Sequence, residues 1–136
     1  MSADRFDKPT RSRVMRAVKR RDTGPERVVR KLCTAIGARY RLDDARYPGR
    51  PDLMFARRSK AIFVHGCFWH GHDCARGARM PKANAGYWSA KIARNQARDA
   101  ATLSALSERG ISALVLWECE LREEAALERR LRAFLR

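Results

Sequence analysis

The sequence predicts a mixed α/β fold built from a helix, three short strands, a long helix, a fourth strand and a last helix. Two observations support this class. Apolar side chains recur at helical spacing in three segments, and short apolar segments bounded by turn residues lie between them. This order is typical of a mixed sheet flanked by helices. With 136 residues, 45% of them hydrophobic, the chain is expected to form one domain over residues 1–136.

Two helices are expected in the first third of the chain. A short basic helix is predicted from Thr10 or Ser12 through Arg20. Residues 23–26, with the sequence TGPE, match a capping box that has proline in the first turn. The helix that begins there has apolar residues at helical spacing and ends at Gly37.

Three short strands are predicted next, at residues 39–42, 52–56 and 61–65. A tight polar turn at residues 57–60 joins the second strand to the third. Because the connections are short, we expect consecutive strands to pair antiparallel.

The last third of the chain predicts a helix, a strand and a helix. A long helix is expected from about residue 85 to 108, closed by Gly110. The apolar segment 111–117 is typical of a buried strand, and its Trp117 is interpreted as a core residue. An amphipathic helix over 123–136 completes the fold.

Charge is the strongest compositional signal. Lys and Arg number 30 against 15 Asp and Glu, which gives a formal net charge of +15. Residues 8–31 carry ten of the basic side chains. Such an excess is typical of nucleic-acid binding, so residues 1–22 are predicted to form a basic arm or helix that contacts DNA. No apolar segment is long enough to span a membrane, and a soluble cytoplasmic protein is expected.

The cysteines and histidines predict a metal site. All three histidines lie within residues 65–72, beside two of the four cysteines. Cys67, His72, Cys74 and the more distant Cys119 can supply three sulfurs and one imidazole, a set that suits tetrahedral zinc. The alternative is that Cys67 and Cys119 are buried apolar residues. Cys33 shares the apolar stripe of its helix and is interpreted as core.

His70 is left over once this zinc set is complete. An imidazole beside a metal centre is a candidate general base, and the alternative is a surface or supporting residue. Asp52 leads from a Pro-rich turn into a strand, where its carboxylate can bind magnesium, although Asp after Pro is also common in turns.

Several polar residues have both a structural and a functional interpretation. Glu26 fills the last position of the capping box and needs no other role. Asn95 and Asp99 interrupt the apolar stripe of the long helix, either for a structural hydrogen bond or for function. In the functional interpretation Asp99 orients His70, and Asn95 with Lys91 faces DNA.

Aromatic residues lie close to the basic segments. Phe68 and Trp69 sit within the metal-site window, and Trp88 begins the long helix. Flat apolar side chains near cationic groups are suited to stacking on bases or wedging between them, and Met15 on the basic helix could wedge from the opposite groove. Core packing is the alternative for each, but the adjacent Phe68 and Trp69 cannot both face one core.

These segments together resemble the very-short-patch-repair (Vsr) endonucleases, which nick DNA beside T:G mismatches left by deamination of 5-methylcytosine. The resemblance covers nearly the whole chain. It rests on KPTRSRVMR at 8–16, DTGPE at 22–26, PGRPD at 48–52, FVHGCFWHGHDC at 63–74, YW at 87–88 with Lys91, Asn95, Arg98 and Asp99, and WEC at 117–119.

The resemblance implies a fold like that of type II restriction endonucleases, with structural zinc at the four residues named above. It implies that Asp52 binds magnesium together with the main-chain carbonyl of Val64, where threonine is expected in the family. It also implies that His70 is the general base and that Asp99 orients it. The supporting residues of this site are Glu26 and His65.

The resemblance also implies contacts with DNA. The residues implied to wedge into the duplex beside the mismatch are Phe68, Trp69 and Trp88, with Met15 entering from the minor groove. Lys91 and Asn95 are implied to contact the mismatched pair. A monomer is expected because a mismatch lacks two-fold symmetry. A functional link to a DNA cytosine methyltransferase and to downstream repair proteins is expected as well.

Two other functions fit part of the sequence. A zinc-stabilised DNA-binding module without catalysis explains the charge, the cysteines and the aromatic residues, but not the combination of Asp52, His70 and Asp99. The other is a nuclease of the same fold with a different DNA target, such as a restriction-type enzyme or a repair enzyme that acts on another distortion.

Overall fold

The computed structural model describes residues 24–68, 70–72, 74 and 83–136. The predicted basic helix, the arm at 1–22, Met15 and Trp69 lie outside these residues. The elements described are α2 (Gly24–Ile36), β1 (Arg41–Leu42), β2 (Leu53–Phe55), η2 (Ala56–Arg58), β3 (Lys60–His65), α3 (Ala85–Glu108), β4 (Ser112–Trp117), η3 (Glu118–Glu120) and α4 (Glu124–Phe134). The predicted order of helices and strands is confirmed for this part of the chain.

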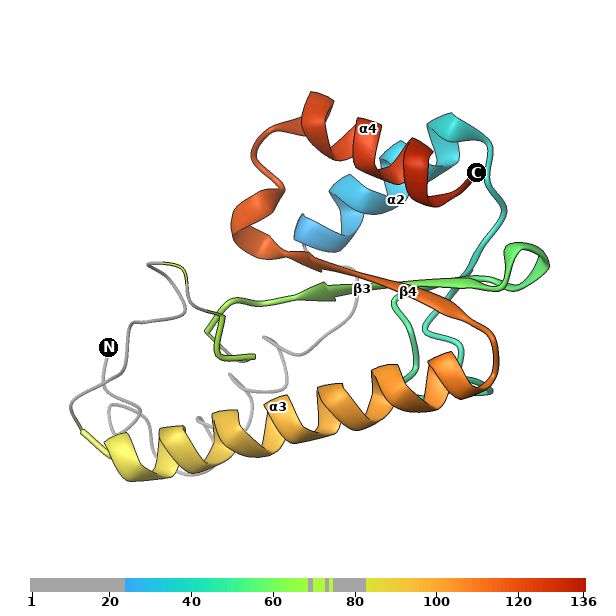
Figure 1. Ribbon diagram of the computed structural model, residues 1–136. Coiled ribbons are helices and arrows are strands. Elements are labelled where there is room, and N and C mark those ends of the chain that lie inside the picture. The colour runs from blue at the N-terminus through green and yellow to red at the C-terminus, as the bar shows by residue number, and fades with distance from the viewer. Residues whose placement is uncertain (1–23, 69, 73, 75–82) are drawn as a thin grey trace.

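The four strands form one mixed sheet in the order β1-β2-β3-β4 (Figure 1). β1 pairs antiparallel with β2, and β2 antiparallel with β3, as the short connections predict. β4 then pairs parallel with β3, in a register that sets Lys60 beside Ser112 and His65 beside Trp117. The long helix α3 makes the crossover that a parallel pair requires.

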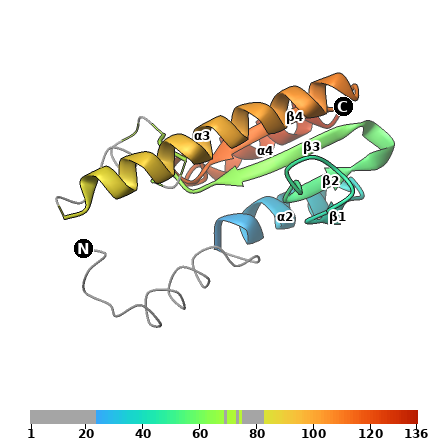
Figure 2. The ribbon, with the colours of Figure 1, turned by 90° about the horizontal axis from the view of Figure 1, so that it is seen from below.

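Helices cover both faces of this sheet (Figures 1 and 2). α2 and α4 lie over one face, and α3 runs along the other. Alternation along β2 explains the arrangement, since Leu53 and Phe55 join the apolar cluster beneath α2 and α4 while Met54 joins the cluster beneath α3. All three residues of β2 are buried, which is expected for a strand covered on both faces.

The β2–β3 connection is the predicted tight turn, and β2 is one residue shorter at each end than predicted. β2 ends at Phe55 because residues 56–58 turn into the short helix η2 instead of extending the strand. Ser59 closes this turn in the left-handed conformation, with φ of 53°. β1 is also shorter than predicted, with two exposed residues.

The C-terminal helix is fixed to this connection by two cations. Arg58 donates a hydrogen bond to the carbonyl of Leu135, and Lys60 donates to the carbonyls of Phe134 and Arg136. Positive side chains at the C-terminus of a helix complement its exposed carbonyl groups and its dipole. Residues near the end of the chain are thereby held against the middle of the sequence.

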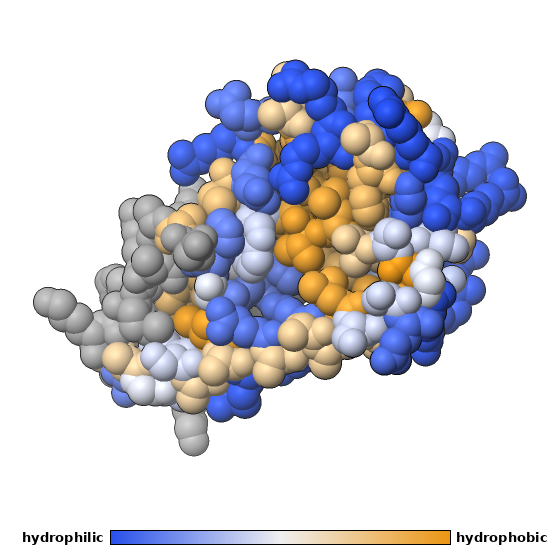
Figure 3. Space-filling model, viewed as in Figure 1, coloured by the Kyte–Doolittle hydropathy of each residue, from blue (hydrophilic) through white to orange (hydrophobic). Residues whose placement is uncertain are grey.

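Figure 3 shows apolar residues gathered in the middle of this face of the molecule, where β4 runs between α3 and α4, with mostly hydrophilic residues above them and a mixed surface along α3. β4 is the outermost strand of the described sheet on this side. Among the described residues, no helix is long and apolar enough to cross a membrane.

Candidate active site and metal centre

A cleft of about 470 Å³ lies where the C-terminal end of β3 meets the start of α2 and the middle of α3. It brings together residues that are far apart in the sequence. The polar side chains along its walls include Glu26, Asp52, His65, His70, Asn95, Arg98 and Asp99. Carboxylates, imidazoles and a guanidinium group therefore face one space, which suits acid–base chemistry on an anionic substrate.

Asp52 lies beside β3 at the edge of this cleft. Its Oδ2 atom accepts a hydrogen bond of 2.7 Å from the main-chain N–H of Val64. The N–H and C=O of one residue in an extended strand point to the same side, so the Val64 carbonyl is on the side of Asp52. A carboxylate and a carbonyl oxygen are hard ligands of the kind that magnesium prefers, so these two residues fit that ion.

His70 forms a short hydrogen bond across the cleft. Its Nδ1 atom lies 2.6 Å from Oδ2 of Asp99, and each side chain is about one quarter exposed. An ionised carboxylate only accepts hydrogen bonds, so in a neutral imidazole paired with it Nδ1 carries the proton and Nε2 presents a lone pair. A neutral imidazole of this tautomer can act as a general base, and a carboxylate at Nδ1 can stabilise the imidazolium that would result.

His65 lies against His70 but has a different environment. The two rings stack with centroids 3.8 Å apart and planes within 3° of parallel. His65 is 8% exposed, and burial, followed by the charge of His70, lowers the pKa of His65 to about 4. His65 is therefore neutral near pH 7.

His65, His70 and Asp99 are close enough together to suggest a metal site, but the stacked rings argue against one. An imidazole binds a metal through a lone pair that lies in the plane of the ring. Two parallel rings cannot both place one ion in their planes. The arrangement instead suits a hydrogen-bonded His70–Asp99 pair supported by a neutral His65.

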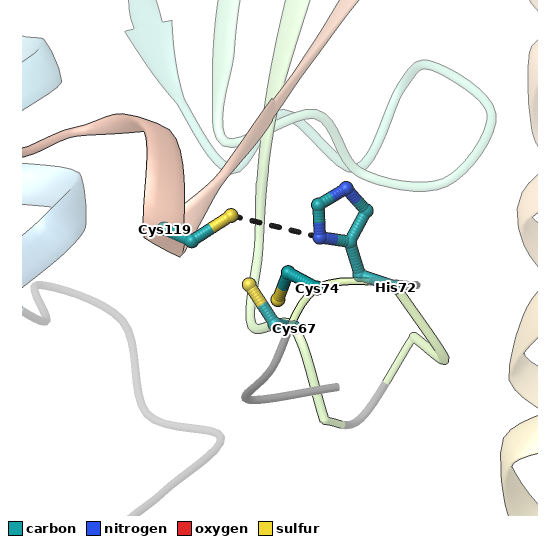
Figure 4. Close-up of side chains that lie close together, drawn as sticks. All are labelled: Cys67, His72, Cys74 and Cys119. Carbon is teal, nitrogen blue, oxygen red and sulfur yellow. Dashed lines mark hydrogen bonds between the residues drawn. The ribbon is translucent and has the colours of Figure 1, made fainter. Parts of the chain in front are cut away.

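The predicted Cys₃His set does converge (Figure 4). The ligand atoms of Cys67, His72, Cys74 and Cys119 all lie within 4.8 Å of one another. The first three come from the loop after β3, and Cys119 comes from η3, directly after β4. Cys119 Sγ is 3.6 Å from His72 Nδ1. Tetrahedral zinc with its usual bond lengths places a sulfur and a nitrogen ligand roughly 3.6 Å apart, so the set is compatible with zinc.

The thiols of the Cys₃His centre and the thiol of Cys33 have different surroundings. Burial raises the pKa of Cys67 to about 12 and also raises that of Cys119. A bound cation would have to displace these protons, so metal binding and pH are coupled. Burial likewise raises the pKa of Cys33 to about 12, but Cys33 is fully enclosed in the apolar cluster beneath α2 and α4. Its interpretation as a core residue is confirmed.

The residues predicted to contact DNA fall into three groups. Phe68 and Asn95 line the cleft. Trp88 and Lys91 lie on α3 outside its lining, and Trp88 is only 5% exposed because it packs edge-to-face against Phe68 at 5.7 Å. Met15 and Trp69 lie outside the described residues.

Glu26 has a position that the capping interpretation does not require. It lies in the first turn of α2, as that interpretation expects, but it also lines the cleft that contains Asp52. Thr23, the expected capping residue, is outside the described part of the chain. α2 therefore brings a further carboxylate to the cleft.

The expected core position of Trp117 is wrong. Its ring is partly buried and belongs to neither apolar cluster, because it stacks on His72 at 4.2 Å instead. Gln96 was not singled out from the sequence, yet its Nε2 atom donates to the carbonyl of Gly71, between His70 and His72. Gln96 lies three residues before Asp99 on the same face of α3, and this spacing is the signal that could have identified it.

Comparison with known proteins identifies a matching family and several relatives that are described as DNA endonucleases or nicking enzymes. The family model described as DNA mismatch endonuclease Vsr matches residues 3–76. The type II nicking enzyme V.XorIIP of Xanthomonas oryzae pv. oryzae is 46% identical over 97% of this chain and 96% of its own length. The type II nicking enzyme V.NmeAIP of Neisseria meningitidis is 40% identical over 98% of this chain and 94% of its own. The DNA mismatch endonuclease Vsr of Escherichia coli K12 is 42% identical over 93% of this chain and 85% of its own.

Proposed function

This chain belongs to the Vsr family of DNA mismatch endonucleases, and on that basis we propose that it nicks one strand of duplex DNA on the 5′ side of the thymine in a T:G mismatch. It is a DNA endonuclease, like its relatives. The proposed mismatch is the one that deamination of 5-methylcytosine leaves. The reaction is hydrolysis of one phosphodiester bond, dependent on magnesium.

One observation carries the proposal above all. Asp52 and the His70–Asp99 pair line the same cleft, so a carboxylate suited to a hard cation and an imidazole with the tautomer of a general base face one space. In the proposed reaction Nε2 of His70 takes a proton from the attacking water. Asp99 holds the ring and stabilises its positive charge, while Glu26 and His65 support the site.

Magnesium is proposed to be held by Asp52 and the main-chain carbonyl of Val64, where it supplies positive charge to the phosphate and to the leaving oxygen. Only main-chain atoms of Val64 are needed, so valine is adequate at this position. Structural zinc is proposed at the Cys₃His centre, which fixes the loop after β3 to the segment after β4.

The DNA contacts are proposed from the cleft beside the middle of α3 and from the residues of α3 that precede it. Phe68 lines the cleft and packs against Trp88, and Trp69 is its neighbour in sequence, which supports a shared role for these rings. These aromatic residues are proposed to wedge beside the mismatch, and Met15 to enter from the minor groove. Lys91 and Asn95, one turn apart on α3, are proposed to contact the mismatched pair.

The remaining features follow from this function as proposals. The mixed sheet with helices on both faces is consistent with a restriction-endonuclease-like fold, and residues 1–136 are proposed to form one domain with a basic DNA-contacting arm at 1–22. A monomer acting in the bacterial cytoplasm is expected. A functional link to a DNA cytosine methyltransferase is also expected, since such an enzyme makes the base whose deamination gives the mismatch.

The test is a nicking assay on end-labelled duplexes with T:G, another mismatch or C:G at one position, with magnesium or with EDTA. The proposal expects a magnesium-dependent nick confined to the T:G duplex and placed 5′ of the thymine. Nicking of a different mismatch would contradict the proposed T:G substrate, but the protein would still be a DNA endonuclease. Tight binding without any nick would favour a DNA-binding module.

A further inference from the structure

Trp117 contacts all three histidines of the chain. Its ring stacks on His72, with centroids 4.2 Å apart and planes 15° apart. The ring centroids of Trp117 and His65 are 5.1 Å apart with planes at 75°, and those of Trp117 and His70 are 6.2 Å apart with planes at 73°. These are the offset-stacked and edge-to-face geometries that aromatic pairs prefer. One indole therefore lies between a ligand of the Cys₃His centre and the two stacked histidines of the cleft.

The backbone holds this ring in place from two directions. Trp117 ends β4, and its parallel partner on β3 is His65. Its main-chain N–H donates a hydrogen bond of 2.9 Å to Oε1 of Glu120, which closes the turn of η3. Cys119 lies within that same turn. The position of the indole is thus tied to the sheet on one side and to a metal ligand on the other.

The histidine pair depends on side contacts of this kind. Asp99 fixes one nitrogen of His70, but a single hydrogen bond leaves an imidazole free to rock about its own axis. Stacking on His65 limits that motion from one face. The Trp117 edge-to-face contacts with both rings limit the sideways movement of the stacked pair.

We propose that Trp117 is a positioning residue, which couples the Cys₃His centre to the His70–Asp99 pair and holds the His70 ring in the orientation that donates its Nδ1–H to Asp99. This inference rests on the proposed function for its effect on nicking. The orientation of His70 itself can be measured without any DNA.

Two substitutions of Trp117 distinguish the effect of its aromatic ring from the effect of its apolar volume. Trp117→Phe keeps an aromatic surface for His72 and the histidine pair, whereas Trp117→Leu keeps apolar bulk without a ring. Phe134→Leu is a matched control, because Phe134 is also a partly buried aromatic residue but packs against the apolar cluster beneath α2 and α4. Each protein is purified whole, and its zinc content is measured beside that of the wild type.

The first readout is the imidazole spectrum of protein labelled with ¹⁵N in its histidine rings, and with three histidines there are only six ring nitrogens to assign. Wild type, Trp117→Phe and Phe134→Leu are expected to show one His70 tautomer, with Nδ1 protonated. Trp117→Leu is expected to show a mixture of tautomers or a broadened signal. A wild-type His70 spectrum in Trp117→Leu would overturn the inference.

The second readout is the single-turnover nicking rate with saturating enzyme, set against the affinity for the mismatched duplex. A misplaced general base is expected to slow the chemical step of Trp117→Leu roughly 10- to 100-fold, with affinity little changed and partial recovery in Trp117→Phe. Equal losses in both variants together with loss of zinc would assign Trp117 to the stability of the metal centre alone and overturn the inference. Absence of nicking by the wild type would instead refute the proposed function, and the ring spectra would still decide the position of His70.

Discussion

His70 and Asp99 are 29 residues apart in the sequence, yet Nδ1 of His70 lies 2.6 Å from Oδ2 of Asp99. His70 follows β3, and Asp99 lies in the middle of α3, the helix that crosses over to the parallel strand β4. The crossover helix α3 therefore both connects the strands and carries Asp99, the carboxylate that pairs with His70.

Replacing Asp99 with asparagine tests this relationship. The amide is nearly the same shape as the carboxylate but carries no charge, so it cannot stabilise an imidazolium at His70. We expect the nicking rate to fall by about 10²- to 10⁴-fold in Asp99→Asn, with zinc content and DNA affinity close to those of the wild type. Glu108→Gln, at the end of the same helix, is the control for loss of one negative charge. A rate within about twofold of wild type would remove Asp99 from this role.

Asp52→Asn tests the magnesium assignment while retaining the local structure. The carbonyl oxygen of the amide can still accept the hydrogen bond from Val64 N–H, so the melting temperature should change little. The charge that favours a dication is gone, and nicking should become undetectable at a magnesium concentration that saturates the wild type. The measurement is nicking across a magnesium titration, with thermal unfolding of both proteins in parallel. Wild-type nicking by the variant would exclude Asp52 as a metal ligand.

Cys119→Ser and Cys33→Ala form a matched pair for the cysteines. Serine at position 119 replaces one of four converging ligands, so we expect loss of bound zinc and a large loss of thermal stability. Alanine at position 33 removes only a buried sulfur from the core, so we expect about 1 kcal/mol of destabilisation with zinc retained. Zinc per chain by atomic emission, followed by thermal unfolding, measures both effects. Equal zinc contents in the two variants would contradict the assignment of the metal centre.

Gly49 is required by close packing next to the cleft. It has φ of 75°, and a Cβ atom built there would approach the Thr102 methyl group on α3 within 2.3 Å. We expect Gly49→Ala to lower the free energy of unfolding by about 2–3 kcal/mol, from backbone strain and overpacking together.

Two other glycines supply the controls for that substitution. Gly37 has a positive φ but open space around the added Cβ, so Gly37→Ala isolates the backbone cost of about 1–2 kcal/mol. Gly24 has neither feature, and Gly24→Ala should be neutral or slightly stabilising at the start of α2. Chemical denaturation of all three variants should give this order, and a Gly49→Ala protein no weaker than Gly37→Ala would show that Thr102 moves aside without cost.

The sequence by itself determined the elements and the chemistry that is local in the chain. Periodicity predicted α3 over residues 85–108, because a helix repeats its buried face every three to four residues. Short connections predicted the antiparallel pairs, and three ligands of the Cys₃His centre lie within eight residues, so their convergence needs only one loop. The predicted turn between the second and third strands is present, but β2 ends one residue before the predicted bound because Ala56 belongs to the short helix η2.

Tertiary structure alone decided which faces meet. The pattern of α3 marked Asp99 as an exception in an apolar stripe, but only the path of α3 across the sheet places its carboxylate on His70. Likewise, an apolar strand ending in tryptophan predicts burial, yet the parallel register of β3 and β4 sets Trp117 beside His65 and directs its ring to the histidines. The physical reason is that periodicity identifies which side chains of one element lie on its buried face. The partners that these side chains contact depend on strand register and helix packing between segments distant in the chain.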